Sequence, residues 1–70
     1  MKTETYIVDN HTITVEFKKL SDTDYVWTIL KDNKFYCESF VPYATEEGMY
    51  ESARLKVRES FPNATLKNDQ

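Results

Sequence analysis

Apolar and polar side chains alternate most clearly between residues 12 and 18, where the sequence reads TITVEFK. Every second position is apolar, and this period of two is typical of a half-buried β-strand. Three other runs, at residues 3–8, 25–31 and 34–41, are rich in β-branched and aromatic residues. Such residues favour strands. The pattern therefore predicts four strands in the first forty or so residues of the chain.

The residues between these runs are of types that favour tight turns. Asp9-Asn10 and Asp32-Asn33 separate the first pair and the last pair of runs. Both residue types tolerate left-handed backbone, so each dipeptide predicts a two-residue hairpin loop. The polar stretch from Ser21 to Asp24 reads as a four-residue loop between the hairpins. We therefore predict an antiparallel meander whose first and fourth strands form the sheet edges.

The period changes after Pro42. Thr45 can cap a helix, Glu46 and Glu47 suit its first turn, and Pro62 limits its end. At helical spacing, one apolar face forms from Met49, Tyr50, Ala53, Val57 and Phe61. The predicted fold is α+β, a ββββα two-layer sandwich with one C-terminal helix on one face of a four-stranded antiparallel sheet. It makes one domain over residues 1–62, followed by a polar, frayed tail over residues 63–70.

The hairpin loops assign side chains to the two faces of the sheet. Residues directly opposite each other share a face, and the predicted loops place Tyr6 opposite Ile13, Phe17 beside Thr28 and Leu30 opposite Phe35. The residues expected in the core are Val15, Phe17, Leu30, Phe35, Ala53 and Val57, with Cys37 on the same side. The face expected to stay uncovered presents Tyr25, Trp27, Ile29, Tyr36 and Phe40, with Lys18 at its margin. A register slip of one residue would exchange the faces of the second hairpin.

An uncovered aromatic face has two interpretations. Exposed aromatic pairs across strands can simply stabilise a sheet. A contiguous exposed apolar patch on a small protein usually marks an interaction surface instead. We favour the second interpretation, because burying one such large side chain contributes about 1.5–3 kcal/mol and five of them would be left in water.

The composition of the chain excludes several kinds of functional site. A single Gly leaves no Gly-rich phosphate loop, and a single Cys leaves no internal disulfide and no cysteine zinc site. The first ten residues lack the apolar run of a signal peptide, so we expect a cytoplasmic protein. His11 is the only histidine, and no His, Cys or carboxylate cluster has ligand spacing. We therefore expect no catalytic residues, no metal site and no cofactor.

The sequence thus predicts a small non-enzymatic module that binds protein through its aromatic sheet face. The partner is another protein or a second copy of the chain. By analogy alone, such a module suits an adaptor or a stoichiometric inhibitor, of the kind that bacteria and their phages encode as short chains.

The alternative is nucleic-acid binding through the same face. Lys18, Lys31 and Lys34 flank Trp27 and Tyr36 in the predicted sheet, and aromatic residues beside lysines bind single strands. From Thr12 to Phe61 the layout is similar to that of AP2-type and integrase arm-binding DNA domains. Those domains are basic, whereas this chain has a net charge of −3.

Overall fold

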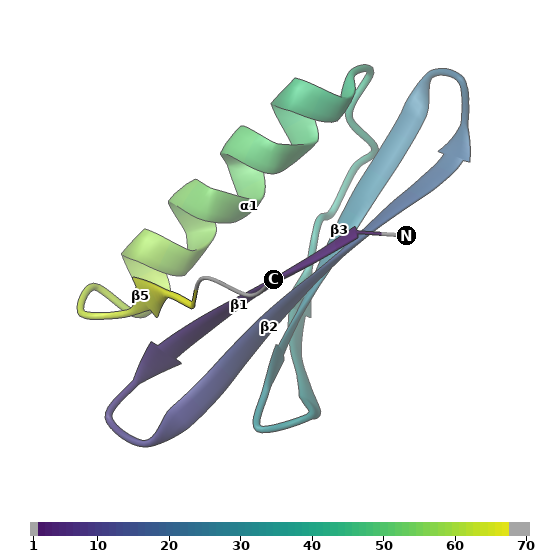
Figure 1. Ribbon diagram of the computed structural model, residues 1–70. Coiled ribbons are helices and arrows are strands. Elements are labelled where there is room, and N and C mark those ends of the chain that lie inside the picture. The colour runs from purple at the N-terminus through teal and green to yellow at the C-terminus, as the bar shows by residue number, and fades with distance from the viewer. Residues whose placement is uncertain (1, 68–70) are drawn as a thin grey trace.

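A computed structural model describes residues 2–67 and shows one helix lying over one face of an antiparallel sheet (Figure 1). The elements in chain order are β1 (Lys2–Val8), β2 (His11–Ser21), β3 (Asp24–Lys31), β4 (Lys34–Glu38), α1 (Glu46–Ser60) and β5 (Thr65–Leu66). The strand order across the sheet is β4-β3-β2-β1-β5. The predicted α+β two-layer fold is confirmed.

Both predicted two-residue hairpin loops are present. Asp9 and Asn10 have φ of 47° and 69°, and Asp32 and Asn33 have φ of 52° and 68°. Two successive positive φ angles define the turn whose twist matches that of the flanking strands. The first hairpin has the predicted register, since Tyr6 pairs with Ile13.

The register between β2 and β3 differs from the prediction. Ser21 pairs with Asp24, so the turn itself lies within the predicted loop. The pairing then shifts at a bulge between Lys19 and Ser21, and Phe17 lies opposite Trp27 rather than Thr28. A bulge inserts one unpaired residue into one strand. Every β3 side chain beyond it therefore points to the face opposite to the predicted one.

This shift exchanges the faces of β3. Trp27 is 5% exposed and Ile29 is fully buried beneath α1, so their predicted place on the uncovered face is wrong. Leu30 is half-buried and Phe35 is exposed, so their predicted place in the core is also wrong. The buried core consists of Ile13, Val15, Phe17, Trp27, Ile29, Met49, Ala53 and Val57.

A second bulge lies in β4. Leu30 pairs with Phe35 as predicted, but Ile29 then pairs with Cys37. The extra residue is Tyr36, whose ring lies 5.0 Å from that of Phe61 at the end of the helix. Cys37 consequently lies on the helix side of the sheet, as predicted, although the pairing that puts it there is different.

The helix follows its prediction closely. Thr45 is the N-cap, and its Oγ1 accepts a hydrogen bond of 3.0 Å from the backbone N–H of Gly48. Glu46 and Glu47 occupy the first turn, where carboxylates complement the helix dipole. The predicted core positions Ala53 and Val57 are buried.

The C-terminal segment adds a fifth strand. Thr65 and Leu66 pair with Ile7 and Tyr6 of β1, so β1 is not the sheet edge that the meander predicted. The predicted polar tail thus contains this two-residue strand. The end of that tail, residues 68–70, lies outside the described part of the chain.

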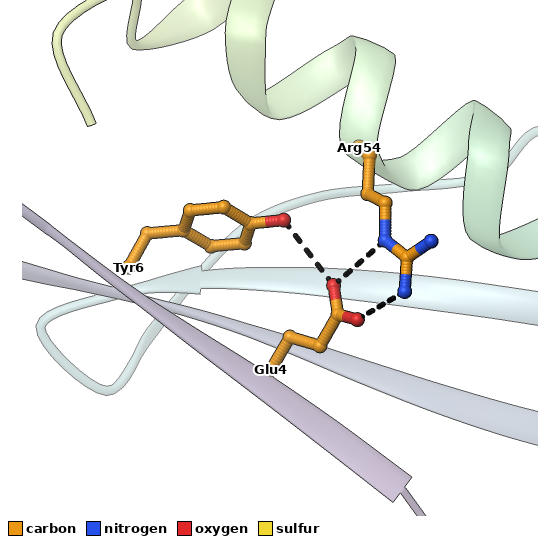
Figure 2. Close-up of polar contacts among 3 residues, drawn as sticks. All are labelled: Glu4, Tyr6 and Arg54. Carbon is orange, nitrogen blue, oxygen red and sulfur yellow. Dashed lines mark hydrogen bonds and ion pairs between the residues drawn. The ribbon is translucent and has the colours of Figure 1, made fainter. Parts of the chain in front are cut away.

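A charged cluster fastens the helix to β1 (Figure 2). Arg54 of α1 donates two hydrogen bonds to the Glu4 carboxylate, one from Nε at 3.2 Å and one from Nη2. The Tyr6 hydroxyl donates a third to Oε1 of Glu4, at 3.2 Å. The Glu4 side chain is only 9% exposed. The bonds from Arg54 lower the pKa of Glu4 against the opposing effect of burial.

We expect Glu4→Gln to lower the free energy of unfolding by about 1–3 kcal/mol at pH 7, because it weakens a charge-assisted pair. The folded-state pKa of Glu4 is below its ordinary value of 4.5. Its contribution is therefore present above pH 4.5 and is lost as the pH falls through the lowered pKa. Urea titrations between pH 3 and pH 7 should show a smaller acid-dependent loss in Glu4→Gln than in the wild type. An unchanged profile would contradict this role, and Glu16→Gln, which removes an exposed carboxylate on the other face of the sheet, is the control.

Candidate protein-binding surface

The residues predicted for the interaction face do not lie together. Trp27 and Ile29 are in the core, as described above. Tyr25 is half-buried against the same core, and the Lys19 ammonium lies 5.9 Å from its ring centroid. Lys18 pairs with Val26 on the uncovered face. Only Tyr36 and Phe40 remain exposed aromatic residues of that predicted set.

The residues of the nucleic-acid alternative are separated too. Lys31 pairs with Ile13 on one side and with Lys34 on the other, and residues opposite each other share a face. Both lysines therefore belong to the helix side, whereas Lys18 belongs to the uncovered side. The structure does not bring the three lysines together around Trp27.

The uncovered face is less aromatic than predicted. Its central strands present threonines and charged residues, with half-buried Val26 and Leu30 between them. Its members on β1 to β4 include Ile7, Thr12, Thr14, Glu16, Lys18, Val26, Thr28, Leu30, Phe35 and Glu38. Phe35, at 64% exposed, is its only exposed aromatic side chain among these residues.

Several exposed aromatic and aliphatic side chains lie instead along β4 and where the chain leaves it. Ser39 still pairs with β3, because its N–H donates to the Trp27 carbonyl at 3.0 Å. Tyr43 returns to the same strand and exchanges two backbone hydrogen bonds with Tyr25, of 2.9 and 2.8 Å. Residues 40–42 connect these two anchors and are exposed. We call residues 39–43 the anchored loop.

Side-chain hydrogen bonds to β3 and α1 also hold the anchored loop in place. Trp27 Nε1 donates a hydrogen bond of 3.3 Å to Ser52 Oγ on the helix, and the Tyr43 hydroxyl bonds to the same Ser52 oxygen. Ser39 Oγ accepts from the Trp27 backbone N–H at 3.3 Å. Buried tyrosine and tryptophan need polar partners of this kind. Ser52 therefore joins strand, loop and helix at one point.

The tip of the anchored loop is apolar and faces solvent. Phe40 is 99% exposed and Val41 is 62% exposed. Pro42 follows, and its missing N–H keeps this part of the chain from pairing like a regular strand. The loop therefore presents two apolar side chains on a backbone that is fixed at both ends.

A groove of about 270 Å³ lies beside this tip, between the anchored loop and α1. Trp27, Tyr43 and Ser52 contribute to it from within, and Leu55, which is 48% exposed, contributes from the helix. A second hollow runs along β4 from Phe35 to Phe40 and shares residues 37–40 with the first. We call the exposed apolar residues that line the two hollows the loop patch: Phe35, Tyr36, Phe40, Val41 and Leu55.

The titratable side chains around this surface indicate little chemistry. Burial raises the pKa of the Cys37 thiol, against the smaller opposing effect of Lys56. A raised pKa makes a thiol less reactive. Residues 2–67 contain no group of three or more His, Cys, Asp or Glu side chains that could hold a metal ion.

His11 links the two hairpin loops through its contact with Asp32. Its Nδ1 lies 2.7 Å from Asp32 Oδ2, and the Thr12 N–H donates to Asp32 Oδ1 at 3.0 Å. These two hydrogen bonds, with that from Thr12 the stronger influence, lower the pKa of Asp32. The arrangement holds the two loops at the same end of the sheet.

Comparisons with known protein families, with curated proteins and with solved structures found no match to this chain. Among the described residues, α1 is too short and too polar to cross a membrane, and no other helix is present.

Sequence reasoning identified only part of the loop patch. It included Tyr36 and Phe40, but it assigned Phe35 to the core and did not include Val41. The predicted apolar face of the helix did not include Leu55, which agrees with its exposure. The signal that could have revealed the loop is the apolar pair Phe40-Val41 immediately before Pro42, since a proline there ends regular pairing.

Proposed function

We propose that this chain is a small, non-enzymatic module that binds protein in the cytoplasm and that the loop patch is its binding surface. The observation that carries the proposal is the complete exposure of Phe40 on a loop anchored at both ends. The cytoplasmic setting is supported by the single cysteine, which allows no internal disulfide.

The energetics of the loop patch support binding rather than folding. Burying one large apolar side chain stabilises a protein by about 1.5–3 kcal/mol. Phe40 and Val41 obtain little of this in the isolated chain, because both face solvent. A partner that covers them would supply that stabilisation, and exposed apolar patches commonly mark such sites.

The fixed backbone of the anchored loop also favours binding. Ordering a flexible loop at an interface costs free energy. Residues 39 and 43 are already held by hydrogen bonds to β3, so a partner meets a tip whose ends do not need ordering. Aromatic side chains that fill pockets on a partner carry most of the affinity in many protein interfaces. Phe40 is an exposed aromatic side chain of the kind that can do so.

The proposal can be tested by retention of proteins from an extract of the native host. We expect the immobilised wild-type chain to retain a partner that the double variant Phe40→Ser/Val41→Ser loses. The matched control is Ile7→Ser/Leu20→Ser, which removes two other exposed apolar side chains outside the loop patch. No retained protein, or equal loss in both double variants, would contradict the proposal.

We predict no binding of single- or double-stranded nucleic acid at physiological salt. The lysines of that alternative lie on different faces, and carboxylates of Glu16 and Glu38 share the uncovered face with Lys18. Fluorescence anisotropy with labelled oligonucleotides between 50 and roughly 200 mM salt is a suitable assay, because phosphate contacts depend steeply on salt. A micromolar, salt-sensitive complex that is lost in Lys31→Glu/Lys34→Glu would replace protein binding as the leading function.

A further inference from the structure

The two sides of the sheet differ in how they are protected against pairing with another chain. Edge strands present backbone N–H and C=O groups to other strands, and charges or bulges commonly prevent such pairing. On one side, β4 has the bulge at Tyr36 and the exposed charges of Lys34 and Glu38. Regular pairing of a further strand with β4 is therefore disfavoured.

The charges of β1, on the other side, do not guard its outer edge. The Lys2 ammonium lies 4.7 Å from the centroid of the Tyr50 ring, and the Glu4 carboxylate is paired with Arg54, so both side chains are directed to the helix. The seven residues of β1 contain no proline, and their pairing with β2 has no bulge. β1 itself therefore has the features of an edge that another strand can join.

The structure shows an extended segment on this edge, and the segment belongs to the chain itself. β5 pairs antiparallel with Tyr6 and Ile7 of β1 (Figure 1), and the Lys67 N–H donates to the Thr5 carbonyl at 2.7 Å. We call residues 65–67 the strap. Both residues of β5 are exposed, Leu66 by 57%, so backbone hydrogen bonds rather than side-chain packing hold β5 on β1.

We propose that the outer edge of β1 is a docking site for an extended segment of a partner protein, and that the strap occupies this site until the partner displaces it. The strap itself shows the chemistry of the occupant, which is a backbone that pairs antiparallel with β1. The strap meets β1 only from Thr5 to Ile7, whereas a longer segment can pair along all seven residues of the strand. The site lies across the sheet from β4 and is separate from the loop patch.

The side chains of β1 indicate which peptide suits the site, because residues opposite each other share a face. An apolar residue suits the position opposite Tyr6, where Leu66 lies in the strap. An acidic residue suits the position opposite Lys2, and β-branched residues suit those opposite Thr3 and Thr5. The peptide acetyl-ATLTVTE-amide meets these requirements, and its Thr-Leu repeats the sequence of β5.

A disulfide that locks the strap gives the first test, with the isotope-labelled full chain. Thr65 lies directly opposite Ile7, a separation that a disulfide can span, and Cys37→Ser removes the only native cysteine. In Cys37→Ser/Ile7→Cys/Thr65→Cys, oxidation should hold the strap on β1 and reduction should release it. We expect the peptide, at up to about 1 mM, to shift the amide signals of Thr3 and Thr5 in the reduced protein only.

A proline in the strap should have the opposite effect to the disulfide. Lys67→Pro removes the N–H that donates to Thr5, whereas Lys67→Ala changes the same side chain and keeps that N–H. Because the peptide competes with the strap, the loss of one hydrogen bond should raise its affinity about two- to tenfold in Lys67→Pro relative to Lys67→Ala. The peptide acetyl-ATLPVTE-amide, whose proline takes the position of Lys67, should bind to neither variant.

Equal binding of acetyl-ATLTVTE-amide to the oxidised and reduced proteins, or no binding to either, would overturn the inference. So would an affinity that is no higher in Lys67→Pro than in Lys67→Ala, or amide shifts confined to residues 39–43. Circular dichroism melting would verify that each variant is folded. None of these measurements involves the loop patch, so retention of a partner from extracts stays a separate test of the proposed function.

Discussion

Ile29→Ala should lower the free energy of unfolding by about 2–5 kcal/mol, because a fully buried side chain leaves a cavity when it is truncated. Leu30→Ala should cost clearly less, about 1–2 kcal/mol, since Leu30 is half-buried on the face that the helix does not cover. The two neighbours differ little in size but point to opposite faces of β3.

Urea unfolding of both variants, with the m-value checked, measures this difference directly. A Leu30→Ala variant that is the less stable of the two would mean that the bulge between Lys19 and Ser21 is absent. The faces of β3 would then be those that the uninterrupted register predicts.

Trp27→Ala should be the most destabilising of the substitutions considered, at about 3–5 kcal/mol. Trp27 is 5% exposed, and the substitution removes both its packing beneath α1 and its hydrogen bond to Ser52. A domain of this size has a total stability of only several kcal/mol, so much of the variant should be unfolded at 25 °C. Circular dichroism and thermal melting would measure the loss.

Phe40→Ala is the matched control for Trp27→Ala, because it removes an aromatic side chain that is 99% exposed. It should change the free energy of unfolding by no more than about 0.5 kcal/mol. The wild-type emission of Trp27 should be shifted to the blue and should move to the red on unfolding. Emission at the wavelength of free indole in the native protein, or a folded Trp27→Ala variant of nearly full stability, would contradict the core described above.

Much of the fold could be predicted because its signals are local. Alternation marked β2, the Asp-Asn dipeptides marked two hairpin loops, and Thr45 marked the start of the helix. These features depend on residues that are close in sequence, and each has a specific physical cause.

The assignment of faces could not be predicted because it depends on two bulges. The residue at the first bulge, Leu20, lies beyond the alternating stretch of residues 12–18 and is 55% exposed. Nothing in its type requires an interruption of the ladder, yet one inserted residue moved Trp27 and Ile29 from one face to the other. Tertiary packing explains the outcome, since the larger apolar side chains of β3 become buried under the helix.

The candidate surface depended on that same assignment. The sequence predicted an exposed aromatic sheet face, but of its aromatic members only Tyr36 and Phe40 are exposed. In the structure, Trp27 lines the groove from the core side. Phe40 and Val41 are the exposed side chains, and they lie on a loop that leaves the sheet edge. A loop that is anchored by long-range bonds to β3 has no local sequence signal beyond Pro42.

The most direct measurement for the account is photo-crosslinking of the full chain in its native host. A benzophenone amino acid would replace Phe40 in one sample and Leu20, also exposed, in the other. We expect the sample labelled at position 40 to yield a discrete protein adduct, either with a second copy or with a foreign partner, and the sample labelled at position 20 to yield none. No protein adduct at position 40, or the same adducts from both positions, would contradict the assignment of the loop patch as a protein-binding surface.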